Sequence, residues 1–387
     1  MTRSLPGLPA ILPALAGAVL LCAACDDKTA AKSSPSAEAG ASADKYATAD
    51  PKLAKALQAA AASASATGEN GPPPEGIFPP GVADKRHPNG APTTVDMVGD
   101  GNEPRIVLSS GSPDAARTSY GPAALELGMQ TGPRMVTPTI DLGLSLGPAK
   151  RVDATTSHSD DGGSDWLVAD VKKAFPAKEQ MGELPPGTDK AIGSLVGTRV
   201  RVKLSADGAE SDVQTDLAKG AVPEIERVGK NAGEALVLAS VPLPTKPVGV
   251  GAQWIAETRM PLSSLDVIAY RAFKVKSIDG NRIRLSFDLK AYAASPTTTL
   301  GVPKGATMEQ VDAQAQGEME LVRGEVLARK SDVQLRVVML FQAPGTPDPS
   351  DPSSEPGQPP PGKTLSAQMQ SQATFVRGDE LAAAMRH

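Results

Sequence analysis

Apolar and polar residues alternate along much of the chain between Ile140 and Phe375, and this period of two constrains the fold more than any other feature. Successive side chains of a strand point to opposite faces of a sheet, so each run buries one face and leaves the other to water. We therefore expect a mainly β (α+β) fold, a curved antiparallel sheet or half-barrel with one or two helices. The runs that predict strands are Ile140–Leu146, Trp166–Val171, Arg199–Leu204, Glu318–Val322, Val326–Ala328, Val333–Phe341 and Leu365–Phe375.

The clearest hairpin runs from Asp266 to Ala293, with Asp279–Asn281 as its loop. A three-residue loop there places Val275 opposite Leu285 and Phe273 opposite Phe287, so that large apolar side chains pair on one face. A slip of one residue would turn that face to water, so we expect a firm register.

Two segments predict helices instead. After Pro223, apolar residues recur at three- and four-residue spacing from Ile225 to Ala239, although Gly229 and Gly233 each cost about 1 kcal/mol relative to alanine in a helix interior. A shorter helix is expected from Asp379 to Met385.

Composition divides the rest of the chain. Residues 25–103 are rich in Ala, Ser, Pro and Gly and poor in large apolar residues, which predicts a disordered tether. The proline-rich stretch 344–362 predicts a disordered insert, because proline cannot donate a hydrogen bond within a sheet. The β-rich domain then comprises residues 104–343 and 363–387.

The first 24 residues have the composition of an export signal. Arg3 precedes an apolar run from Leu5 to Leu21, and the small residues Ala23 and Ala24 stand directly before Cys25. This pattern resembles a lipoprotein signal peptide, which implies a diacylglycerol on the Cys25 thiol, a membrane as partner and a location in the cell envelope. Two alternatives stay open: ordinary cleavage without a lipid, or retention as a membrane anchor, which the prolines at positions 6, 9 and 13 disfavour.

A second resemblance lies further along the chain, in Leu243–Trp254, which reads L-P-T-K-P-V-G-V-G-A-Q-W. It is similar to the L-P-x-x-P-V-x-V-G-x-x-W stretch of uncharacterised bacterial envelope lipoproteins, which also share a strand like Gly197–Arg199 followed by Asp207–Gly208. The resemblance spans Leu125 to Phe375 and implies an antiparallel, β-rich envelope domain of no known activity.

Four residues of that stretch have an expected structural role. Pro247 restrains the entry to a strand, Gly249 and Gly251 permit a close approach or a bulge, and Trp254 buries a large ring. Stacking of Trp254 on a ligand is the alternative.

We expect no catalytic residue, metal site or cofactor. The three histidines, His87, His158 and His387, are scattered along the chain. A triad would have to use His158, and a cation site beside it would have to use Asp160, Asp161 and Asp165, whose spacing does not match a calcium loop. The formal net charge of −5 argues against nucleic acid as a partner.

The sequence therefore favours a non-enzymatic, lipid-anchored binding module for an apolar ligand, such as a lipid, or for an envelope protein. A purely structural interaction protein and a hydrolase with an unfamiliar site are the alternatives.

Overall fold

The computed structural model describes residues 73, 75–109, 120–132, 135–148, 166–177, 184–205, 207–222, 225–298, 302–344 and 362–384. The signal peptide, Cys25, the tether up to residue 72, His158 with its neighbouring aspartates, His387 and residues 345–361 of the insert lie outside this part of the chain.

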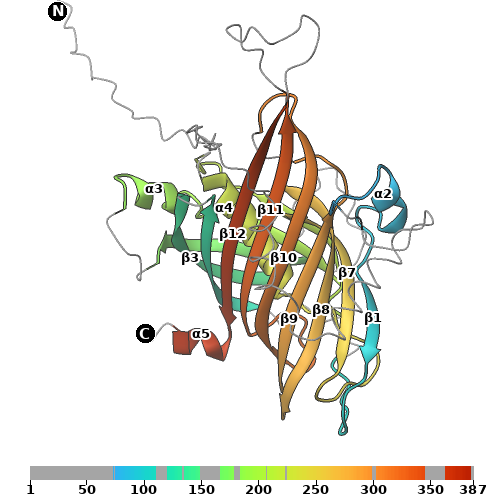
Figure 1. Ribbon diagram of the computed structural model, residues 1–387. Coiled ribbons are helices and arrows are strands. Elements are labelled where there is room, and N and C mark those ends of the chain that lie inside the picture. Colours follow the sequence, from blue (N-terminus) through green and yellow to red (C-terminus); the bar gives the residue numbers. More distant parts are fainter. Residues whose placement is uncertain are drawn as a thin grey trace, which may run out of the picture.

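The described residues form one antiparallel sheet of twelve strands, so the prediction of a mainly β fold is confirmed (Figure 1). Its strands lie in the order β1-β7-β8-β9-β10-β11-β12-β2-β3-β4-β5-β6. The strands are β1 (Thr94–Gly99), β2 (Gly121–Thr131), β3 (Met135–Pro148), β4 (Trp166–Pro176), β5 (Arg199–Leu204), β6 (Glu210–Asp216), β7 (Gln253–Leu262), β8 (Leu265–Asp279), β9 (Arg282–Ala293), β10 (Thr307–Val322), β11 (Lys330–Ala343) and β12 (Lys363–Arg377).

The predicted core pairs of the β8–β9 hairpin are confirmed. Phe273 pairs with Phe287 and Val275 with Leu285. The loop is one residue shorter than predicted, because Asp279 pairs with Arg282, and a register shift between Val275 and Ser277 compensates for the difference. A bulge thus preserves the buried face while a tight turn closes the hairpin.

Other strands differ from their predicted bounds. Strand β10 begins at Thr307, eleven residues before the predicted start at Glu318. The predicted strand Val326–Ala328 is only a connection, in which Leu327 makes an isolated bridge to Ser240. Strands β2 and β6 lack strict alternation of apolar and polar residues and were not predicted.

The helix α4 (Glu226–Ala239) confirms the predicted helix and packs inside the curve of the sheet, behind β10, β11 and β12 in Figure 1. Its two glycines explain how it fits there. A Cβ atom on Gly229 would lie 2.5 Å from Leu217 Cδ2, and one on Gly233 would lie 2.9 Å from Thr215 Oγ1. The cost of glycine in a helix is therefore offset by a close approach to β6.

The two edges of the sheet approach each other, because the sheet curls around α4. Thr93, directly before the edge strand β1, donates its backbone N–H to the carbonyl of Glu210 in the other edge strand β6, at 3.0 Å. Helix α4 and this contact together close the concave face on that side.

The prediction that residues 25–103 are a disordered tether is wrong for residues 75–103. This part contains the helix α2 (Val82–Arg86) and strand β1, and it crosses the outer face of the sheet. Phe78 and Ala83 are buried there against Tyr270 and Tyr292. A stretch poor in apolar residues folds here because the outer face of β7–β9 supplies the apolar surface that it lacks.

Two short helices complete the fold. Helix α3 (Thr188–Gly193) packs beside β4, and α5 (Asp379–Ala384) confirms the predicted C-terminal helix. Within the described residues, no helix is long and apolar enough to cross a membrane.

Candidate functional site

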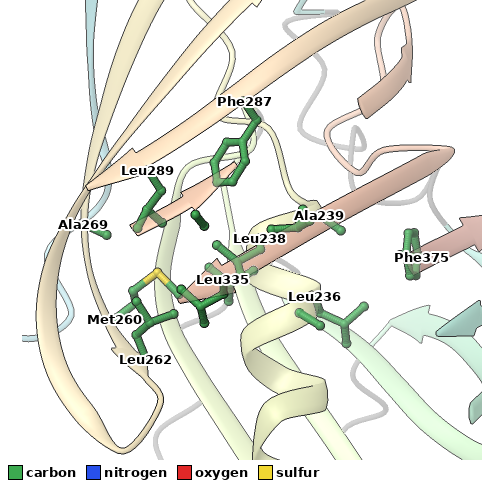
Figure 2. Packing of buried hydrophobic residues seen from close by; sticks show 14 of the residues in the cluster. Leu236, Leu238, Ala239, Met260, Leu262, Ala269, Phe287, Leu289, Leu335 and Phe375 are labelled. Carbon is green, nitrogen blue, oxygen red and sulfur yellow. The ribbon is translucent and has the colours of Figure 1, made fainter. Parts of the chain in front are cut away.

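The concave face of the sheet has two sectors, and they differ in how completely they are filled. Under β7, β8 and β9, which we call the filled sector, Trp254, Phe273 and Phe287 are 0–1% exposed. The Trp254 and Phe273 rings stack with centroids 5.4 Å apart, and Trp254 Nε1 donates a hydrogen bond to the Pro242 carbonyl at 2.8 Å. Trp254 is thus a core residue with its polar atom satisfied. Figure 2 shows Leu238 and Ala239 of α4 among the strand residues Met260, Leu289, Leu335 and Phe287.

The other residues of the Leu243–Trp254 stretch lie at the entry to β7. Gly249 permits a close approach, since a Cβ atom there would lie 1.6 Å from the Asn102 carbonyl oxygen. Gly251 has a φ of +86°, which favours glycine, and Pro247 is exposed. The contacts at Gly249 and Trp254 hold the chain segment before β7 in place.

A buried ion pair joins the edge of the sheet to the filled sector. Arg271 Nη2 lies 2.5 Å from Glu210 Oε2, and the two side chains are 0% and 1% exposed. Thr93, Thr258 and Ser240 also hydrogen-bond to members of this pair. Arg271 Nη1 donates to the Val237 carbonyl at 3.0 Å, so the guanidinium also binds the C-terminal end of α4. The cluster ties β6, β8 and α4 together.

Under β12 and β2, which we call the open sector, inward-facing side chains are less buried. Phe375 and Leu125 are 1% and 0% exposed, but Ala373, one step further along β12, is partly exposed. Leu365, Ala367 and Ser371 of β12 and Met129 of β2 are also partly exposed, although the β11 residues that pair with this part of β12 are buried. Met369 of β12 and Ala123 and Leu127 of β2 are buried. We call this surface the inner wall: Leu365, Ala367, Met369, Ser371 and Ala373 of β12 and Met129 of β2.

Helix α4 has a line of three polar side chains, two of which reach β2 beside the inner wall. Arg227, Asn231 and Glu234 are spaced at i, i+4 and i+7, which places them along one helix face. Arg227 Nη1 approaches Thr131 Oγ1 at 3.5 Å, and Asn231 Nδ2 donates to Met129 Sδ at 2.7 Å. We call these three residues the polar strip.

Glu234, the innermost residue of the polar strip, is buried without a salt bridge among the described residues. Both of its carboxylate oxygens accept the backbone N–H of Ser263, at 3.0 Å. Burial raises the pKa of Glu234 to about 7, although the Ser263 N–H and the charge of Arg227 act in the opposite direction. The carboxyl is therefore largely neutral in mildly acidic solution.

Few titratable groups lie near this region among the described residues. In the described part of the chain, no group of three or more His, Cys, Asp and Glu side chains could hold a metal ion. His87 is buried on the outer face, where its Nδ1 lies 3.9 Å from Glu257 Oε1 and desolvation lowers its pKa. The polar groups of α4 that lie beside the inner wall are the Arg227 guanidinium and the Asn231 amide, and both act there as hydrogen-bond donors.

The sequence-based reasoning missed the polar strip and the Arg271–Glu210 pair. One signal was present: Arg271 interrupts the apolar positions Ala269 and Phe273 on the predicted buried face of the hairpin. Cys25 lies outside the described residues, so its lipidation stays a prediction. No protein-family model matches the chain, and no curated protein sequence matches it.

Proposed function

We propose that this protein binds an apolar ligand on the concave face of its sheet, without catalysing a reaction, while a lipid on Cys25 holds it in the cell envelope. The inner wall is the observation that carries the proposal. Its apolar side chains lie on the concave side of the sheet and pack against the core, yet all of them except Met369 stay partly exposed. Apolar surface that folding leaves accessible in a concave site favours an apolar ligand.

A steric substitution on the inner wall tests ligand binding. The protein is the chain from residue 25 onward carrying Cys25→Ala, which keeps every described residue and needs no detergent. The probe is Nile red, a neutral apolar dye, with its fluorescence titrated against protein. Ala373→Phe is expected to weaken binding about tenfold, since overpacking a site costs about 1–3 kcal/mol.

The matched control is Gln372→Phe, one residue away on the exposed outer face of β12. It adds the same ring and should change the affinity less than twofold. Equal effects of the two variants, or no binding by the parent chain, would refute the proposal. A thermal unfolding curve for each variant shows whether it is folded.

The membrane anchor has a separate test. Cell fractionation should find the parent protein with the membranes and the Cys25→Ala variant released, because Cys25 is the predicted acylation site. Cys22→Ala is the control, since Cys22 lies in the predicted leader and should leave membrane association unchanged. Unchanged association of Cys25→Ala would exclude the lipid.

A further inference from the structure

The most informative group beside the inner wall is the guanidinium of Arg227. It stands in the first turn of α4 and is half-buried. Among the described residues it forms no salt bridge, and its one hydrogen bond, to Thr131 Oγ1, is long at 3.5 Å. Arg271, by contrast, is paired with Glu210 and also donates to Thr258 and to the Val237 carbonyl, although its Nε has no partner among the described residues. Arg227 therefore keeps most of its donors available.

The guanidinium is also next to the apolar surface. Thr131 pairs with Met369 across β2 and β12, so Arg227 lies beside the inner wall. Along β12 the wall extends from Leu365 to Ala373, which is about 26 Å at 3.3 Å per residue. Met369 lies midway along this length, so about 13 Å of the wall extends to either side of Arg227, and an alkyl chain whose polar end lies at Arg227 can cover one half of the wall.

The neighbouring amide adds a second donor. Asn231 Nδ2 donates only to the Met129 thioether, a weak acceptor, although a carboxylate or phosphate oxygen would be a much stronger one. Glu234 does not oppose an anion in mildly acidic solution, because burial keeps its carboxyl largely neutral below about pH 7. The positive charge of Arg227 and the N–H donors of Arg227 and Asn231 therefore favour a ligand group that accepts hydrogen bonds.

We propose that the ligand is an anionic amphiphile, an alkyl chain ending in a carboxylate or a phosphate, and that Arg227 binds its anionic group. This inference rests on the proposed function, because it requires the inner wall to bind the chain. Arg227 forms charge-assisted hydrogen bonds to the anion, Asn231 adds another, and the alkyl chain covers the partly exposed inner wall.

Four probes with the same twelve-carbon chain test the inference: dodecanoate, dodecyl phosphate, dodecanol and dodecylamine. The affinity of each probe is measured by its displacement of Nile red at pH 6 from the chain carrying Cys25→Ala. The two anions are expected to bind about tenfold or more tightly than dodecanol, since hydrogen bonds to charged groups are among the stronger ones. Arg227→Gln should remove this advantage and change dodecanol binding less than twofold. Preference for dodecanoate would indicate a fatty acid, and preference for dodecyl phosphate would indicate a phospholipid head group.

Two further variants control the experiment. Lys230→Gln removes an exposed positive charge from the same helix and should leave all four affinities within twofold. Arg227→Lys keeps the charge and should retain part of the preference for anions. If Arg227→Gln does not fold, the ranking of the four probes on the parent chain decides the question.

Two outcomes are distinguishable. If dodecanol and dodecylamine bind as tightly as the anions, the inner wall binds alkyl chains and only the role of Arg227 is wrong. If none of the four probes displaces Nile red, the proposed function fails together with this inference.

Discussion

Two regions of the concave face hold a buried carboxyl group, the sheet edge at β6 and the turn between β7 and β8, and the two groups are treated differently. Glu210 in the filled sector has Arg271 as an ion partner, with Thr93 and Ser240 as hydrogen-bond partners. Glu234, on α4, has a single hydrogen-bond donor among the described residues, the backbone N–H of Ser263 in the turn between β7 and β8. The first arrangement keeps a charge buried by satisfying it, whereas the second leaves a carboxyl whose pKa lies near neutrality.

The apolar residues of the filled and open sectors differ in how completely they are buried. Aromatic rings complete the packing in the filled sector, whereas Met129, Ala367 and Ala373 on the inner wall stay partly exposed. A region that serves only stability gains by full packing and full hydrogen bonding. A region that binds a ligand must leave some apolar surface exposed and some hydrogen-bonding groups available. The open sector does so.

The largest effect is expected at the Arg271–Glu210 pair. Arg271→Met leaves Glu210 buried without its cation, so the free energy of unfolding should fall by about 3–5 kcal/mol. Urea unfolding at pH 7 measures it. Arg284→Met, at an exposed arginine of β9, is the control and should stay within about 0.5 kcal/mol of the parent. A loss at Arg271 no larger than the control would show that the pair does not hold the filled sector together.

Glu234 should make stability depend on pH. Its pKa is raised from 4.5 unfolded to about 7 folded, so between these values the folded state binds more protons than the unfolded state. Stability from this group is therefore full below about pH 4.5 and falls as pH rises, by on the order of 3 kcal/mol in total by about pH 7.

Urea unfolding from pH 4.5 to 8 of the parent and of Glu234→Gln measures this effect. The variant should gain stability relative to the parent as pH rises, because glutamine keeps an acceptor for Ser263 and carries no charge. A difference that does not change with pH would contradict the raised pKa.

Much of the fold was predictable from local patterns. The alternation predicted the β8–β9 core pairs, and helical spacing predicted α4 in spite of its glycines. Local patterns failed where burial depends on distant segments. Phe78 and α2 fold only because the outer face of β7–β9 is apolar at that place, and the sequence near Phe78 does not record this.

The candidate site was harder to predict for the same reason. Arg227, Asn231 and Glu234 stand at helical spacing, but a polar helix face is usually turned to solvent. Only the curl of the sheet around α4 brings that face to Met129 and Thr131. The function of a polar residue here depends on which strand lies opposite it, and that is a property of the complete topology.

A smaller loss of stability is expected at Gly249, where the segment before β7 of the filled sector passes close to the backbone of Asn102. Gly249→Ala would place a Cβ atom 1.6 Å from the Asn102 carbonyl oxygen, so the segment before β7 must shift. We expect a loss of about 1–3 kcal/mol in the free energy of unfolding. Gly220→Ala is the control, since no atom lies within 4 Å of its added Cβ. Equal stability of the two variants would show that residues 100–103 do not pack firmly on this stretch.

The smallest effect on stability is expected in the open sector, at Asn231. Asn231→Leu removes an amide that donates only to the Met129 sulfur, so the free energy of unfolding should stay within about 1 kcal/mol of the parent. Thr258→Val is the matched change in the filled sector. It removes one buried hydrogen-bond partner from Arg271 and one from Thr93, and should cost about 1–3 kcal/mol. Urea unfolding at pH 6 compares the two. If Asn231→Leu costs as much as Thr258→Val, the polar strip serves the stability of the fold, and the difference between the two sectors is one of exposure alone.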